Sequence, residues 1–134
     1  MSAKGLKDMK NSKYHNRKIT RDGETFDSVR EYNRWCELKL MERAGEVKDL
    51  KRQVKFVLVP AQREKVWNDQ KKRYEDGKVI EREVSYVADF VYTNRLGFMV
   101  VEDTKGYRKG TAYDVFVIKR KLMLYFHRIR IKEI

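Results

Sequence analysis

Apolar residues recur at helical spacing between positions 27 and 45, and this pattern predicts the first helix. A capping-box spacing between Ser28 and Glu31 marks its beginning at Asp27 or Ser28, and Gly45 is a typical stop. At about 100° per residue, Glu31 falls at the edge of the apolar stripe, so its carboxylate should face partly toward the core. The stripe itself consists of Val29, Tyr32, Trp35, Cys36 and Leu40.

Three strands are expected after this helix. Residues 47–59 end in the apolar run FVLV before Pro60, and residues 79–93 and 98–105 are joined by a turn at 94–97. Residues 61–78 are polar and contain the turn signal Asp76-Gly77, so we expect the loop of a long hairpin. The alternative is that this segment inserts Trp67 and Tyr74 into a groove or a branch point of a nucleic acid.

The C-terminal third predicts a helix and a last strand. A basic loop at 106–110 precedes a helix capped by Thr111 that runs to Phe126. The tail HRIRIKEI alternates and reads as a strand with Ile129 and Ile131 on one face. The order helix, three strands, helix, strand predicts a single mixed α/β domain over residues 26–134.

Residues 1–25 differ from the rest because they carry seven Lys or Arg and little apolar content. We expect a basic, partly flexible N-terminal arm that is either solvated or lies along phosphates. Asp22-Gly23 should turn a small hairpin just before the domain begins.

The charge balance narrows the class of partner. The chain has 32 Lys and Arg against 20 Asp and Glu, a formal charge of +12, which favours a polyanion such as DNA. One Cys and two His exclude a disulfide scaffold and a zinc finger. No apolar run approaches the roughly 20 residues of a membrane span, so we expect a soluble protein without membrane contact.

Carboxylates in apolar strands are the candidate chemistry. Asp89 lies inside the run YVADFVY, where a charge is costly unless it is paired or binds a cation. Strand alternation puts Asp103 and Lys105 on one face and Glu102 on the other, and antiparallel pairing brings Asp89 near Asp103. Such oxygen ligands suit Mg²⁺ or Mn²⁺. A bulge before Gly106 would exchange the faces of Glu102 and Asp103, and Glu102 would then be the ligand. The alternative to a metal site is an ordinary buried ion pair of Asp103 or Asp89 with Lys105.

This arrangement resembles the PD-(D/E)xK nuclease superfamily. The stretches of the chain that carry this resemblance are TFDSVREYNRWCELKLMERAGEVKDLKRQVKF, VSYVADFVY, VVEDTKG and YDVFVIKRKLML. They are also similar to a family of short phage-encoded proteins of formerly unknown function assigned to that superfamily, over most of residues 14–134. One departure is Ala88, which stands where the superfamily name has proline.

The resemblance implies an αβββαβ restriction-endonuclease-like core with a mixed central sheet and a Mg²⁺-dependent DNA endonuclease. Asp89, Asp103 and Glu31 would hold metal, and Lys105 would position or activate water. Gln53 and Lys119 would contact DNA, and the adjacent loop residues Arg108 and Lys109 are placed to grip phosphates.

The biological setting is likewise an expectation from the resemblance. It implies structured or branched DNA as substrate, in phage recombination, replication or DNA processing within the cytoplasm of a bacterial host. A homodimer would supply two active sites for paired cuts, and no small-molecule cofactor is expected. The alternative function is a non-catalytic basic DNA-binding module on the same fold.

Overall fold

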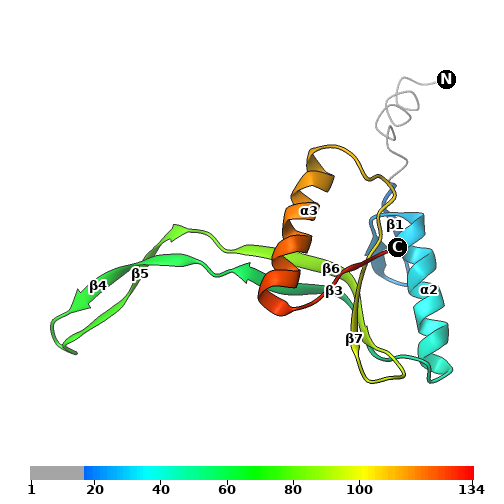
Figure 1. Cartoon of the computed structure of the whole chain (residues 1–134), viewed down its shortest axis with the longest axis horizontal. Helices are drawn as coiled ribbons and strands as arrows, with labels where there is room; N and C mark the ends of the chain where they lie inside the picture. Colours follow the sequence, from blue (N-terminus) through cyan, green and yellow to red (C-terminus); the bar gives the residue numbers. More distant parts are fainter. Residues whose placement is uncertain (1–16) are drawn as a thin grey trace.

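The computed structural model describes residues 17–134, which form a mixed α/β protein around a four-stranded mixed sheet (Figure 1). The strand order is β3-β6-β7-β8, where β3 is Lys48–Val59, β6 is Val84–Thr93, β7 is Met99–Asp103 and β8 is Lys132–Glu133. Neighbouring strands are antiparallel except β7 and β8, which are parallel. Helices α2 and α3 cover opposite faces of this sheet.

Helix α2 (Val29–Arg43) begins where its capping residues predict. Ser28 is the N-cap, and its Oγ accepts a hydrogen bond from Glu31 N at 3.1 Å. Glu31 Oε2 in turn accepts from Asp27 N at 3.0 Å, one residue before the N-cap. The helix ends at Ala44, and Gly45 follows with φ 76°, a conformation that glycine adopts without strain.

Two apolar clusters flank the sheet. Leu38 of α2 packs with Val47, Phe90 and Tyr92 on one face. On the other face, α3 (Thr111–Leu122) and the π-helical turn η1 (Met123–His127) cover the sheet. Their cluster contains Leu58, Tyr86, Ala88, Val91, Val101, Phe116, Met123 and Ile131.

Strand β3 changes face at Gln53. Arg52 lies over the rings of Phe26 and Trp35 on the α2 side, whereas Val54 packs into the α3 cluster. Residues two apart in a regular strand share a face. Gln53 has φ 52°, in the left-handed region, and this irregularity redirects the side chains that follow.

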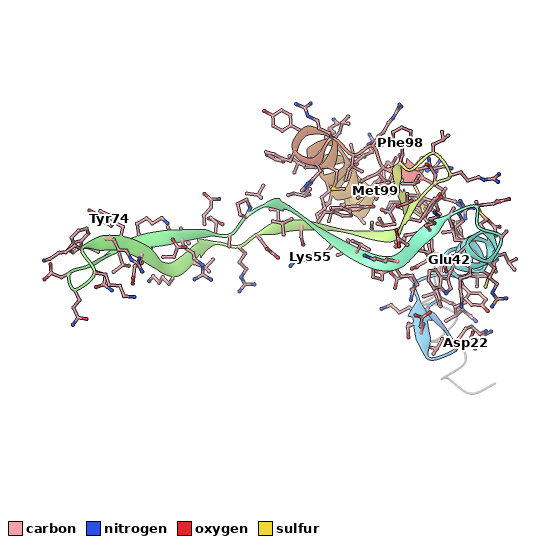
Figure 2. All side chains as sticks on the ribbon, turned by 90° about the horizontal axis from the view of Figure 1, so that it is seen from below. Asp22, Glu42, Lys55, Tyr74, Phe98 and Met99 are labelled. Atoms are coloured by element: carbon pink, nitrogen blue, oxygen red, sulfur yellow. The ribbon has the colours of Figure 1, made fainter. Side chains whose placement is uncertain are left out.

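The long hairpin predicted around residues 61–78 is present, but the loop predicted for this stretch is not, because most of its residues form strands. This stretch belongs to a two-stranded ribbon of β4 (Gln62–Asn68) and β5 (Arg73–Glu81), which projects from the body (Figure 2). We call residues 61–83 the arm. The chain reverses at 69–72, and the predicted turn at Asp76-Gly77 lies inside β5. Gly77 lies close to the opposite strand, and a Cβ there would be 2.7 Å from Val66 Cγ2, so a larger residue would force that side chain to shift.

The predictions for the N-terminal residues and for the start of α3 are confirmed only in part. The predicted hairpin at Asp22-Gly23 is confirmed as β1 (Ile19–Arg21) paired with β2 (Glu24–Phe26). Residues 1–16 of the predicted basic N-terminal segment lie outside the described residues. Thr111 is not the cap of α3, since Gly110 occupies that position without a side-chain hydrogen bond.

The last strand is also shorter than predicted, because β8 spans Lys132–Glu133 alone. Its backbone nevertheless fixes the end of β7. Ile134 N donates to Asp103 O at 2.9 Å, and Lys105 N donates to Ile134 O at 3.0 Å. In the part of the chain described, no helix is long and apolar enough to cross a membrane.

Candidate functional site

An open hollow of about 480 Å³ lies between the N-terminus of α2, the middle of β3 and β6, the end of β7 and one side of α3. Six of the eight residues predicted for the site line it, and the other two do not. Arg108 is exposed, with its Nε 3.9 Å from Glu133 Oε1, and Lys109 is exposed on the loop before α3. The six that the fold brings together are Glu31, Gln53, Asp89, Asp103, Lys105 and Lys119.

Asp103 and Lys105 form an ion pair against an aromatic wall. Lys105 Nζ lies 3.1 Å from Asp103 Oδ2 and 4.0 Å from the centre of the Phe116 ring. Tyr86 OH donates to the same Asp103 oxygen at 3.0 Å. The ammonium is therefore held at the floor of the hollow by a carboxylate and a ring face.

Glu102 points away from the hollow. It is completely buried on the α2 side, where Arg34 donates to both of its carboxylate oxygens at 2.9 and 2.6 Å. Tyr92 OH donates a third hydrogen bond, at 2.6 Å. The bidentate pair raises the pKa of the Arg34 guanidinium above its usual value. Face alternation thus places Asp103 in the hollow and Glu102 in a structural ion pair.

Asp89 is anchored to the residue that follows β7. Its Oδ2 accepts hydrogen bonds from Thr104 N at 2.8 Å and Thr104 Oγ1 at 2.6 Å. Its Oδ1 lies 3.5 Å from Gln53 Nε2, at the limit of a hydrogen bond. One oxygen is therefore held firmly while the other remains near the opening of the hollow.

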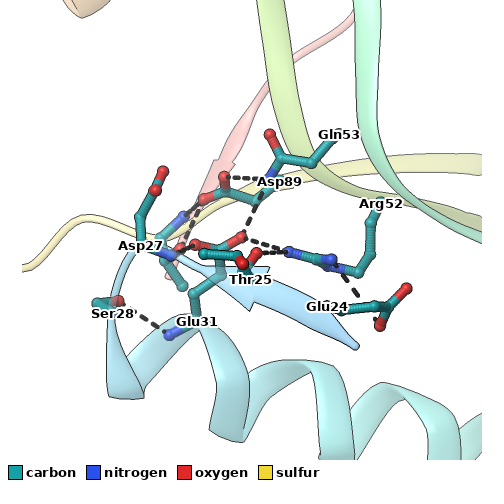
Figure 3. Close-up of polar contacts among 9 residues, drawn as sticks. Glu24, Thr25, Asp27, Ser28, Glu31, Arg52, Gln53 and Asp89 are labelled. Carbon is teal, nitrogen blue, oxygen red and sulfur yellow. Dashed lines mark hydrogen bonds and ion pairs between the residues drawn. The ribbon is translucent and has the colours of Figure 1, made fainter. Parts of the chain in front are cut away.

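Glu31 accepts hydrogen bonds from three different residues (Figure 3). Its Oε1 accepts from Gln53 Nε2 at 3.0 Å and from Arg52 Nη2 at 3.3 Å, while Oε2 accepts from Asp27 N. Gln53 Nε2 thus bridges Glu31 and Asp89. This bridge ties the helix to the sheet across the mouth of the hollow.

The electrostatics of the hollow disfavour negative charge. Burial and the neighbouring carboxylate of Asp89 raise the pKa of Asp103 to about 7, although Lys105 acts in the opposite direction. Burial, followed by the charge of Asp89, also raises the pKa of Glu31. Repulsion among carboxylates is what a bound cation would offset, and the oxygens are the hard donors that Mg²⁺ prefers.

The donor chemistry thus fits a divalent cation, but the ligand geometry is not preformed. Within residues 17–134, no three Asp, Glu, His or Cys side chains converge closely enough to hold a metal ion together. The acids are instead engaged by Thr104, Arg52 and Tyr86. Metal binding would require some of these hydrogen bonds to be exchanged.

Sequence reasoning missed the residues that hold the acids in place. Nothing in the sequence marked Thr104, because it follows the end of the strand. Tyr86 was not singled out because its position in the apolar run indicates an ordinary core residue. Arg52 could have been found, because a buried Glu31 needs a cationic or hydrogen-bonding partner. Gln53 was predicted as a DNA contact, but its amide contacts two carboxylates here.

The comparisons with known proteins give a family and no activity. No curated protein matches the chain, and no solved structure matches it. One family model does match, described as Protein of unknown function (DUF1064), over residues 11–133. Because that match covers nearly the whole sequence, including all of the hollow, the chain belongs to the DUF1064 family.

Proposed function

We propose that this protein is a metal-dependent DNA endonuclease and that the hollow is its active site. The observation that carries the proposal is that α2, β6 and β7 each contribute a carboxylate to one open hollow, beside the largely buried side chain of Lys105. A structural ion pair would need only one acid for Lys105. The surplus of carboxylates beside a surface that should bind polyanions calls for a cation between them.

Two further features support this proposal. The order α2, β3, β6, β7, α3, β8 follows the αβββαβ arrangement of the nuclease-like core that the sequence resembles. In addition, Asp103 and Lys105 share the hollow while Glu102 does not, which is the disposition of an acid-x-lysine motif.

In this mechanism Asp89, Asp103 and Glu31 would bind the metal. When bound, Mg²⁺ or Mn²⁺ would lower the pKa of water and offset charge on the phosphate. Lys105 Nζ would orient the attacking water by hydrogen bonding and neutralise negative charge that develops on the phosphate oxygens. The water oxygen would form the new bond to phosphorus as the bond to O3′ breaks. The water would lose a proton to solvent and O3′ would take one up from solvent, leaving a 5′-phosphate and a 3′-hydroxyl.

Lys119 also lines the hollow and would contact a phosphate next to the scissile bond. Gln53 would hold Glu31 and Asp89 apart and in place. The substrate we propose is structured or branched DNA, as the resemblance implies, in phage recombination, replication or DNA processing.

The test is cleavage of labelled linear duplex, single strand, flap and four-way junction with Mg²⁺, with Mn²⁺ and with EDTA. Asp89→Asn and Lys105→Ala should each reduce the rate by roughly 10²- to 10⁴-fold. Matched controls are Asp114→Asn and Lys78→Ala, because both residues are exposed and neither lines the hollow. The controls should cut like the wild type.

Two results would overturn the proposal. Cleavage that survives in both Asp89→Asn and Lys105→Ala would place the activity elsewhere or in a contaminant. Salt-sensitive DNA binding without cleavage by any form, on any substrate and with either metal, would instead establish a non-catalytic DNA-binding module.

A further inference from the structure

Within the described residues, the arm contacts the rest of the chain mainly at its base, where Glu83 forms an ion pair with Lys55 of β3. Within residues 17–134, β4 and β5 form a separate two-stranded sheet, and neither apolar cluster includes a residue of the arm. Figure 2 shows the arm extending from the body into open space. An isolated two-stranded hairpin is at best marginally stable in water. The arm is therefore a surface that a second molecule would stabilise.

Aromatic and aliphatic side chains are exposed along the arm. Trp67 and Tyr74 form a cross-strand pair next to its tip, with ring centres 5.1 Å apart, and they are 48% and 67% exposed. Val66, Val79 and Ile80 add exposed aliphatic surface. Large aromatic side chains of this kind are characteristic of the central part of protein interfaces.

A second exposed apolar surface lies on the body of the protein. It consists of Ile118, Leu124, Tyr125 and Phe126, each at least half exposed, and we call it the α3–η1 patch. The patch is beside the base of the arm, because His127 Nε2 lies 2.7 Å from Val57 O, just before Pro60 and the arm begin. One chain thus carries an apolar arm tip and, at the foot of the arm, an apolar patch.

We propose that the arm binds a second copy of this chain in a two-fold symmetric dimer. When two arms lie antiparallel, the tip of each reaches the base of the other. Trp67 and Tyr74 of each chain then contact the α3–η1 patch of the other chain, so the dimer contains this contact two times. This is the self-complementary contact that a closed dimer requires. The inference goes beyond the proposed nuclease function and does not depend on it.

The arm is long enough for such an interface. Nine residues of β5 at roughly 3.3 Å each reach about 30 Å, and two paired strands are about 10 Å wide. That gives a flat footprint of roughly 300 Å². Two antiparallel arms make one such contact, which buries roughly 600 Å² counted on both partners, and the two contacts between arm tips and α3–η1 patches add to that area.

Charge favours a protein partner over DNA. Residues 61–83 contain seven Lys or Arg and six Asp or Glu, whereas residues 115–132 contain six Lys or Arg and no acid. The cations nearest the tip are already neutralised within the arm, since Lys72 pairs with Asp69 and both Lys71 and Arg73 pair with Glu75. A ribbon that binds DNA needs cations free to replace counterions. The seven cations and six acids of the arm nearly cancel, so the arm can approach the basic surface around the partner's patch without strong repulsion.

The experiment measures the oligomeric state of the full chain by sedimentation equilibrium. The wild type should be a dimer. Trp67→Ser with Tyr74→Ser, and separately Tyr125→Ser with Phe126→Ser, should each raise the dimer dissociation constant by roughly 100-fold or more. Leu96→Ser is the matched control, because Leu96 is 80% exposed on the turn between β6 and β7, away from both surfaces.

A disulfide trap tests the pairing directly. In a Cys36→Ser background, Asp69→Cys and Leu124→Cys are made in separate chains, and only a mixture of the two should form a disulfide-linked pair rapidly. Wild-type protein that stays monomeric, or a dimer that both double variants leave intact, would overturn the proposal. Arm variants that remain dimeric but lose DNA binding would assign the arm to nucleic acid instead. Circular dichroism of each variant confirms that the body is folded.

Discussion

At the scale of single residues, Gln53 links backbone strain to the candidate site. Its φ of 52° costs roughly 1–2 kcal/mol in a residue with a Cβ. Its amide is nevertheless the group that bridges Glu31 and Asp89. Backbone strain of this kind persists where the surrounding structure enforces it, and it is common at functional sites.

Substitution of Gln53 should therefore reverse the usual preference of a strand for alanine over glycine. We expect Gln53→Gly to have a free energy of unfolding about 1 kcal/mol higher than Gln53→Ala, because both lose the amide and only glycine relieves the positive φ. Urea denaturation measures this difference. At Lys55, an exposed β3 position, the same pair of substitutions should favour alanine. Alanine favoured at both positions would contradict the left-handed conformation.

Asp103 should make stability depend on pH. Its pKa in the folded state is raised to about 7, so the folded protein keeps a proton that the unfolded chain loses near pH 3.8. The contribution of the protonated carboxyl is fully present below that lower value and is lost as the pH rises to 7. The free energy of unfolding should therefore fall across this window in the wild type.

Asp103→Asn carries no titrating proton and should flatten that part of the profile, which parallel denaturation series between pH 4 and pH 8 would show. Glu37→Gln, which removes an exposed carboxylate from α2, is the control and should leave the slope unchanged. Equal slopes in Asp103→Asn and wild type would mean that Asp103 is ionised throughout.

At the scale of secondary-structure elements, the buried contact of Glu102 with Arg34 and Tyr92 joins β7 to α2. We expect Glu102→Gln to lower the free energy of unfolding by about 2–3 kcal/mol, because the largely buried guanidinium of Arg34 loses its counter-charge. Glu37→Gln breaks the exposed pair of the same arginine and should cost at most about 0.5 kcal/mol. Thermal or chemical denaturation compares the two.

The same variant separates the roles of the two adjacent acids. If the hollow cuts DNA, Glu102→Gln should retain cleavage at a temperature where it is folded, whereas Asp103→Asn should lose it. Loss of cleavage in folded Glu102→Gln, with activity kept in Asp103→Asn, would exchange their assignments.

The sequence predicted the main elements of the body but not which face of α2 is buried. Helix α2 was readable from its capping residues, and β3, β6 and β7 from their apolar runs. The expected apolar stripe of α2 was partly wrong, because Val29 and Leu40 are 54% and 63% exposed whereas Leu38 is fully buried. The meeting of Asp89, Asp103 and Lys105 at one hollow followed from two rules, antiparallel pairing and alternation of side chains.

The remaining features depend on contacts that no local pattern encodes. The arm has no buried face, so its strands show no clear alternation and read as a loop. The left-handed backbone at Gln53 carries no glycine signal. β8 is limited to two residues because its length is set by backbone pairing with β7. The side-chain partners of Glu31, Arg52 and Gln53, come from β3, 21 and 22 residues away, and became visible only in the folded chain.

At the scale of the whole molecule, a strongly basic chain carries a hollow that several carboxylates line. The chain carries +12 in total, and residues 115–132 contribute six cations without an acid. A polyanion is attracted over long range by this excess, but phosphates next to Asp89 and Asp103 would be repelled. If the protein binds and cuts DNA as proposed, a divalent cation in the hollow would remove that local repulsion, so metal should strengthen DNA binding as well as enable cleavage.

The salt dependence of DNA binding distinguishes cations that contact phosphate from cations that do not. In the Asp89→Asn background, where cleavage is expected to be lost, Lys119→Ala should reduce the slope of log affinity against log salt by about 1. Lys78→Ala on the charge-balanced arm should leave that slope unchanged. Fluorescence anisotropy with a labelled duplex at several salt concentrations gives both slopes. A smaller slope for Lys78→Ala, with none for Lys119→Ala, would move the phosphate contacts from α3 to the arm and would argue against both the DNA path through the hollow and the arm-mediated dimer.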